Sequence, residues 1–95
     1  MLRVAIFAGN AFTPTEETNN RFFVVTQGVI ESELRIYNRE GLLVFVTNDA
    51  TQGWDGRRTD GVMCEQGNYV WKLTYRAIDH PNSMRSEVGT VLLIR

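Results

Sequence analysis

The side chains that most often carry catalysis or bind metals are scarce in this sequence. Cys64 is the single cysteine and His80 the single histidine among 95 residues. One copy of each leaves no internal disulfide, no cysteine zinc cluster and no histidine-based metal site. His80 is expected in a turn, and Cys64 is expected as a small, partly buried thiol just before a strand. We therefore predict no Ser–His or Cys–His catalytic pair.

Carboxylates are the remaining groups that could do acid–base or metal chemistry. The segment "TEETNN" (residues 15–20) offers oxygen donors for a hard cation, but it lacks the alternating aspartates and the glycine of a calcium loop. The other acidic residues show no spacing typical of a catalytic pair, and we interpret them as solvated surface charge. These residues are Glu31, Glu33, Asp60 and Glu65. The sequence thus predicts no enzyme, no metal and no cofactor.

The string "GWDG" (residues 53–56) allows two interpretations. In a binding module, Trp54 would be a platform for a sugar ring and Asp55 would bind its hydroxyl groups. In the structural interpretation, Trp54 belongs to the core, Asp55 bonds the following backbone and Gly56 supplies a positive φ. We favour the structural interpretation. A carbohydrate-binding or adhesin-type sandwich that uses Trp54 or Trp71 remains the alternative function.

Composition limits the class of protein further. Ten lysines and arginines against eleven aspartates and glutamates give a net charge of −1, with both signs interspersed, which disfavours nucleic-acid binding. Apolar residues make up 43% of the chain, as expected for one globular domain. No apolar run approaches the roughly 20 residues of a membrane span. The opening "MLRVAIFAG" is too short in apolar residues for a signal peptide.

The elements that would position these residues are strands. Turn signals separate short runs rich in β-branched and aromatic residues, and no stretch keeps a helical period. In residues 69–77, apolar and polar side chains alternate, and "NREG" (residues 38–41) is typical of a hairpin turn. Six or seven strands at this spacing favour a β-sandwich. The expected strands cover residues 2–8, 21–27, 33–38, 42–48, 69–77 and 87–95.

Six strings in a fixed order connect the chain to a known family. They are "NAFTP", "NNRFF", "LRIYNREGLLVF", "GWDG", "GNYVWKLTY" and "GTVLLIR". With this pattern the chain resembles the gliding-motility-associated C-terminal domain, the type B sorting domain of the Bacteroidetes type IX secretion system. The resemblance covers about residues 9–95. Residues 15–18 depart from the glycine-rich loop of that family, and Glu40 replaces an aromatic residue.

The resemblance implies a single C-terminal sorting domain over residues 1–95, folded as an Ig-like antiparallel β-sandwich of about seven strands. It also implies a non-catalytic export signal that takes its parent protein through the periplasm and outer membrane to the cell surface or outside. The signal peptide would then lie outside this fragment. The implied partners are the type IX translocon and a PorP/SprF-family outer-membrane protein, with no nucleic acid and no small-molecule substrate.

The family pattern maps onto individual residues of this chain. The candidates for partner recognition are Asn38, Arg39, Gly41 and Arg95. The expected structural positions are Asn10, Phe12, Thr13, Pro14, Asn20, Phe23, Tyr37, Phe45, Trp54, Asp55, Gly56, Gly67, Tyr69, Gly89, Thr90 and Val91.

Overall fold

The computed structural model describes residues 4–15, 17, 20–49 and 51–95. Within these residues the chain forms seven strands and no helix, which confirms the predicted all-β class. The strands are β1 (Ala5–Ala8), β2 (Ala11–Phe12), β3 (Val24–Gln27), β4 (Val29–Tyr37), β5 (Leu43–Thr47), β6 (Gly67–Ala77) and β7 (His80–Leu93). This part of the chain therefore holds no helix with the length and apolar character needed to cross a membrane.

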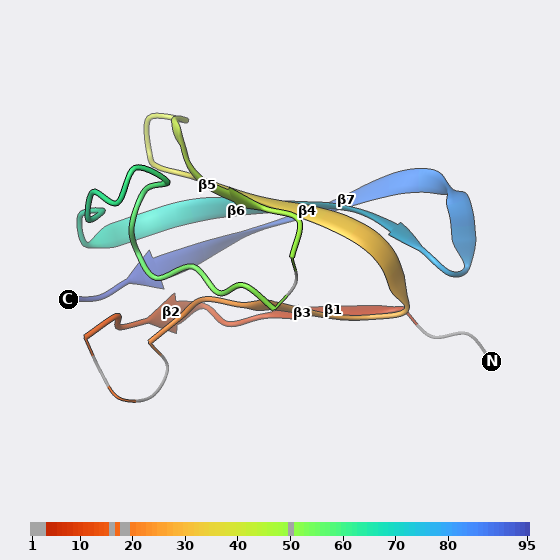
Figure 1. The fold of residues 1–95 in the computed structure, drawn as a ribbon, viewed down its shortest axis with the longest axis horizontal. Coiled ribbons are helices and arrows are strands. Elements are labelled where there is room, and N and C mark those ends of the chain that lie inside the picture. Colours follow the sequence, from red (N-terminus) through yellow and green to blue (C-terminus); the bar gives the residue numbers. More distant parts are fainter. Residues whose placement is uncertain (1–3, 16, 18–19, 50) are drawn as a thin grey trace.

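The strands form two layers. One sheet has the order β2-β7-β6-β4-β5, and β1 pairs with β3 in a second, two-stranded sheet. Figure 1 shows the smaller sheet lying along one side of the larger one, so the predicted sandwich is confirmed. One pairing differs from a purely antiparallel arrangement: β2 runs parallel to β7, with Ala11 beside Leu92 and Phe12 beside Leu93.

Strand β6 supplies a continuous row of core side chains. Tyr69, Trp71, Leu73 and Tyr75 are buried, while Lys72 between them is exposed, which confirms the predicted alternation. The neighbouring strand leaves room for the largest of these side chains. A Cβ atom on Gly89, the residue opposite Trp71, would lie 2.6 Å from the indole nitrogen. The indole thus packs directly against the main chain of β7.

The last residues of the chain are part of the core. β7 lies between β2 and β6, and both Val91 and Leu93 are 0% exposed. Main-chain bonds continue past the strand, because the N–H of Ile94 donates to the carbonyl of Phe12 over 3.0 Å. Burying a valine or leucine side chain contributes about 1.5–3 kcal/mol. The final strand is therefore a major part of a stability of about 5–15 kcal/mol.

Trp54 packs among the aromatic side chains of the core, and its main chain pairs with Phe22, just before β3 of the smaller sheet. Its side chain is 0% exposed, and its main chain exchanges two hydrogen bonds of 2.9 Å with Phe22. Its indole N–H donates to the carbonyl of Arg57 over 2.9 Å, and Phe12 and Tyr69 pack against its rings. The structural interpretation of "GWDG" is confirmed.

Two features of the strands differ from the sequence-based expectation. The two-residue strand β2 was not predicted, and β7 begins at His80 instead of near residue 87. His80, which is expected in a turn, is the first residue of β7, and the turn consists of Ile78 and Asp79. An irregularity in the pairing of β6 with β7 accommodates the segment after His80. It brings Pro81 into the strand, where a proline is tolerated beside an irregularity.

Candidate recognition site

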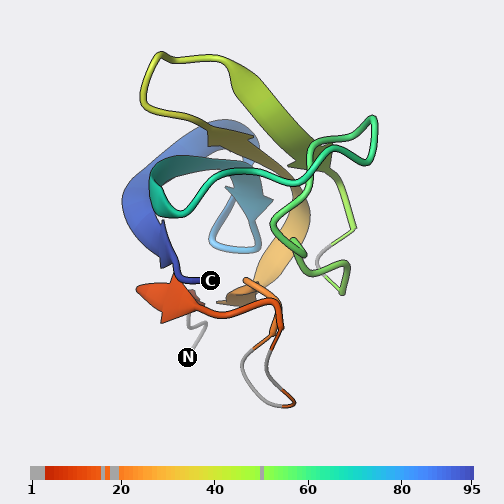
Figure 2. The same cartoon turned by 90° about the vertical axis from the view of Figure 1, so that its left-hand side faces the viewer.

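Three segments that are distant in the sequence meet at one end of the sandwich. They are the β4–β5 hairpin turn (residues 38–41), the loop of residues 53–66, and Arg95. Figure 2 views this end, with the C-terminus near the centre, the β4–β5 hairpin above it and β2 below. The β6–β7 hairpin turn lies at the opposite end (Figure 1). The structure therefore brings the predicted recognition residues to a common end of the molecule.

The β4–β5 turn is built around Asn38. The Asn38 side-chain oxygen accepts hydrogen bonds from the main-chain N–H groups of Glu40 over 2.9 Å and Leu42 over 3.0 Å. Gly41 has a φ of +84°, a conformation that side chains with a Cβ rarely adopt. Asn38 and Gly41 thus shape the turn, whereas Arg39 and Glu40 are exposed at its tip. Of the predicted recognition residues, Arg39 has the freest side chain.

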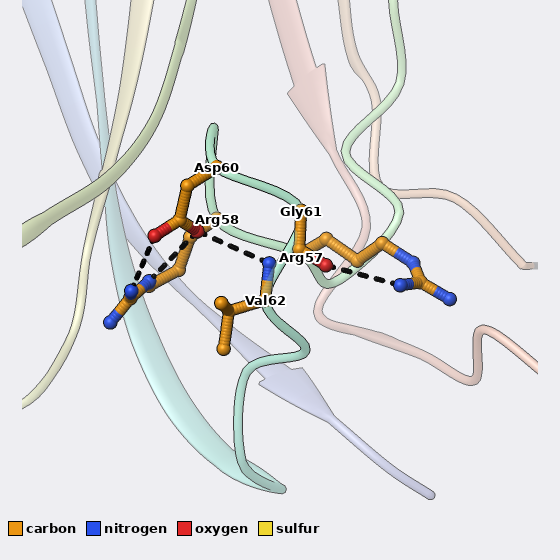
Figure 3. A network of polar contacts seen from close by, with 5 residues as sticks. All are labelled: Arg57, Arg58, Asp60, Gly61 and Val62. Carbon is orange, nitrogen blue, oxygen red and sulfur yellow. Dashed lines mark hydrogen bonds and ion pairs between the residues drawn. The ribbon is translucent and has the colours of Figure 1, made fainter.

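The loop contains a second, smaller hairpin at residues 57–63, which we call the 57–63 hairpin. The N–H of Arg58 donates to the carbonyl of Val62 over 2.8 Å, and Gly61 has a φ of +89°. Figure 3 shows how its polar groups bond to one another. The Asp60 carboxylate accepts from the Arg58 guanidinium over 2.5 Å and from the Val62 N–H over 3.1 Å, and these bonds lower the pKa of Asp60. The Arg57 guanidinium donates to the Gly61 carbonyl over 3.1 Å.

Asp60, expected from the sequence to be solvated surface charge, is bonded within the 57–63 hairpin, which the sequence pattern did not predict. The dipeptide Asp60-Gly61 was the available signal, because an Asp-Gly pair is typical of a tight turn. The bonds from Arg57 and Arg58 had no comparable signal, since arginines are common in any exposed loop.

Arg95 is hydrogen-bonded to the loop of residues 53–66. Its Nε and Nη2 atoms donate to the carbonyl of Cys64 over 3.0 and 2.8 Å, and Nη2 also lies 3.3 Å from the carbonyl of Gly56. Its main-chain N–H donates to Oε1 of Gln66 over 2.9 Å. Most of the guanidinium's hydrogen-bonding capacity is thus used inside the domain. Arg95 lies at the same end of the sandwich as the β4–β5 turn, where it holds the loop that carries the 57–63 hairpin.

A polar cleft of about 410 Å³ separates the two hairpins. The buried Cys64 side chain is part of its lining, and burial raises the pKa of this thiol. Burial, together with the neighbouring Cys64, raises the pKa of Tyr69 to about 12, and the Tyr69 hydroxyl donates to the Glu65 carbonyl over 2.7 Å. The cleft is lined by Asn38, Arg39, Glu40, Val44, Arg58, residues 62–66, Gly67, Asn68 and Tyr69.

The remaining family positions fall in the framework. Phe12, Phe45, Trp54, Tyr69 and Val91 are buried in the core. Others shape the main chain: Gly56 has a φ of +82°, Gly67 a φ of +149°, and the Asp55 carboxylate accepts from the Arg57 N–H over 3.1 Å. Asn10 and Asn20 act through their carbonyls, which accept from Leu92 and from the Arg21 side chain. Thr13, Pro14, Tyr37 and Gly89 are half-buried, while Phe23 and Thr90 are exposed.

The carboxylates singled out from the sequence do not gather into a site. Glu31 pairs with Arg76 over 3.2 Å, Glu33 pairs with Arg35, and Asp60 pairs with Arg58. Across residues 4–15, 17, 20–49 and 51–95, no three Asp, Glu, His or Cys side chains are placed to hold a metal ion. Within the "TEETNN" loop, Glu16, Thr18 and Asn19 lie outside the described residues.

Both tryptophans are unsuited to bind a sugar by stacking. Trp54 is 0% exposed and Trp71 is 7% exposed, so neither indole presents a face to solvent. A stacking platform needs one open face of the ring. The observation on which the carbohydrate-binding alternative rested is therefore removed.

The fold defines a small Ig-like β-sandwich domain. The chain belongs to the CHU_C family of type IX secretion signal domains, whose model matches residues 6–93. The resemblance inferred from the sequence is thereby confirmed, as is the involvement of the type IX secretion system.

Among solved structures, the chain is similar to part of PorZ from Porphyromonas gingivalis, described as an essential bacterial surface component of the type IX secretion system. The TM-score is 0.59 at 21% sequence identity, over 96% of this chain and 12% of PorZ. This likeness concerns the fold, and the chain corresponds to only a small part of that protein. No curated protein matches the chain.

Proposed function

We propose that this domain is a non-catalytic export signal, which directs a larger polypeptide joined to it through the type IX secretion system. The route leads through the periplasm and across the outer membrane, to the cell surface or the outside. The observation that carries the proposal is the family match over residues 6–93. The compact sandwich supports it, because its rigid end offers a shape that a receptor can recognise.

The partner that we propose is an outer-membrane protein of the PorP/SprF family, acting with the translocon. The proposed contact surface is the tip of the β4–β5 hairpin together with the edge formed by the C-terminal residues. Two rigid hairpins at that end would bind with little loss of conformational entropy, because their main chains are already fixed by internal hydrogen bonds.

The proposed function is tested by export of a reporter. A reporter with a signal peptide is fused in front of residues 1–95 and expressed in a host with an active type IX system. We expect the reporter on the cell surface or in the medium. The controls are the reporter without residues 1–95 and the same fusion in a host that lacks the translocon. A reporter that stays in the periplasm of the active host would refute the proposal.

Within the same assay, Arg39→Ala tests the contact surface. Arg39 is exposed at the hairpin tip, and the salt bridges of the described residues do not include it. We expect reduced export with a change in stability within about 0.5 kcal/mol, as is usual for an exposed side chain. Asn38→Ala is a poorer test, because losing the two bonds to its side chain also loosens the turn.

The matched control is Lys72→Ala, which removes the same charge from the exposed face of β6. Normal export of Arg39→Ala, at the level of Lys72→Ala, would remove Arg39 from the contact surface.

A further inference from the structure

Strand β6 extends beyond the strand that pairs with it on one side. The pairing of β4 with β6 ends at Tyr37 and Val70, where the chain turns away into the hairpin. β6 continues for three more residues, Gly67, Asn68 and Tyr69, which pair with β7 on the other side. In the part of the chain that the structure describes, no strand lies beside these three residues on the β4 side.

This open edge carries unused hydrogen-bonding groups. Successive residues of a strand direct their N–H and C=O groups to alternate sides. Leu92 donates its N–H to Asn10 on the β2 side, so Val91 and Leu93 direct theirs toward Tyr69 and Gly67 of β6. Asn68, which lies opposite Leu92, therefore directs its N–H and C=O groups toward the side that β4 has left. The cleft of about 410 Å³ lies at this place, because the same three residues line it together with Asn38, Arg39 and Glu40 of the turn.

The opposite wall of the cleft is fixed and partly apolar. In the 57–63 hairpin, the Asp60 carboxylate accepts hydrogen bonds from the Arg58 guanidinium and the Val62 N–H, as Figure 3 shows. The Val62 side chain lines the cleft and is 50% exposed. Arg95 holds the base of this wall through the carbonyl of Cys64. An apolar side chain on a rigid, internally bonded hairpin is well suited to contact a partner.

We propose that this cleft receives a short extended segment of an outer-membrane component of the export machinery, which continues the sheet where β4 ends. This inference rests on the proposed function. The segment would lie along residues 67–69, a length of about 10 Å, bond through its main chain to Asn68, and pack an apolar side chain against Val62. Main-chain bonds are available to any sequence, so the side chains that line the cleft supply the selectivity.

The first test compares two valines in the reporter fusion. Val62→Asp places a charge on the cleft wall, and Val88→Asp places the same charge on the outer face of β7, where Val88 is 62% exposed. We expect Val62→Asp to reduce export at least about tenfold, as for loss of a central interface contact. Val88→Asp should be exported normally. Thermal melts of both variants verify that each is folded. The pair Met63→Ser and Met84→Ser repeats the comparison with methionines of 52% and 56% exposure.

The second test identifies the segment and its mode of binding. A photo-crosslinking amino acid at position 62 of the exported fusion, and at position 88 as control, is followed by mass spectrometry of the crosslinked peptides. We expect position 62 to capture one segment of an outer-membrane component. A synthetic peptide of that segment, added to residues 1–95, should slow amide hydrogen exchange at Asn68. A peptide of scrambled sequence should leave the exchange unchanged.

The outcomes separate this inference from the proposed function. If the wild-type fusion is not exported, the proposed function fails, and the cleft proposal fails with it. If the wild type is exported and Val62→Asp is exported as well as Val88→Asp, only the cleft proposal is wrong. Binding of the peptide without slower exchange at Asn68 would also overturn it, as would capture of a second copy of this chain.

Discussion

Tyr69 connects the aromatic core to the cleft. Its ring and the Trp54 ring pack edge to face, with 5.1 Å between the ring centres. Its hydroxyl donates a hydrogen bond to the Glu65 carbonyl. Cys64, Glu65 and Arg95 are the titratable residues that influence it. Because the phenol is buried and donates a hydrogen bond, its ionised form is disfavoured in the folded state. This residue therefore links the stability of the domain to alkaline pH.

The pKa of Tyr69 is about 12 in the folded domain, compared with about 10 in an unfolded chain. The stabilisation is fully present below pH 10, and it is lost as the pH rises from about 10 to about 12. We expect the free energy of unfolding to fall in this window by up to about 1.4 kcal/mol per pH unit from this group. Tyr69→Phe should remove that part of the slope and lower stability at pH 7 by about 1 kcal/mol.

Urea titrations of the wild type and of Tyr69→Phe at several pH values between 9 and 12 measure the effect. The phenylalanine variant keeps the aromatic ring and its contact with Trp54, so a difference between the two proteins is due to the hydroxyl group. Equal slopes for the two proteins would contradict the assignment to Tyr69.

Individual residues differ in how far the sequence could predict their roles. The Asp-Gly turn after Trp54 and the turn at Asn38 were predictable, because each depends on a local rule of main-chain geometry. The brace made by Arg95 was not, since it joins the last residue to carbonyls at positions 56 and 64. A main-chain carbonyl has no signature in the sequence, so such long-range bonds are visible only in the fold.

At the scale of elements, β7 illustrates both what periodicity predicts and what it misses. The apolar run at its end predicted a core strand, and Val91 and Leu93 are fully buried. Its early start and its parallel contact with β2 could not be predicted. Two residues are too few to show a period, and residues 80–86 are mostly polar because they lie in an exposed hairpin. Here tertiary pairing decides the structure where local propensity does not.

Two valines on opposite faces of β7 make it possible to test how much the buried face of this strand contributes to the stability of the domain. Val91 is 0% exposed on the core side, whereas Val88 is 62% exposed on the other. We expect Val91→Asp to destabilise the domain by more than about 4 kcal/mol, because an unpaired carboxylate would be buried. Val88→Asp should change stability by no more than about 0.5 kcal/mol. Thermal or urea unfolding of the two variants checks this, and a cooperatively folded Val91→Asp of wild-type stability would contradict it.

At the scale of the whole molecule, the sandwich separates its two ends. One end carries the β6–β7 hairpin turn, and the other gathers the β4–β5 hairpin, the 57–63 hairpin and Arg95 (Figures 1 and 2). The core and the cleft share residues, since Tyr69 and Cys64 belong to both. Any change that unfolds the core will therefore also disrupt the proposed recognition surface. We infer that the export machinery recognises the folded domain and not a linear stretch of its sequence.

Export of the reporter fusion carrying Val91→Asp, beside Val88→Asp and the wild type, tests this claim most directly. Each variant differs from the wild type at one position of β7, and the rest of the linear sequence is the same in all three fusions. We predict that the wild type and Val88→Asp reach the cell surface or the medium, while Val91→Asp, shown to be unfolded by its melt, stays in the periplasm. Efficient export of the unfolded Val91→Asp fusion would contradict the account.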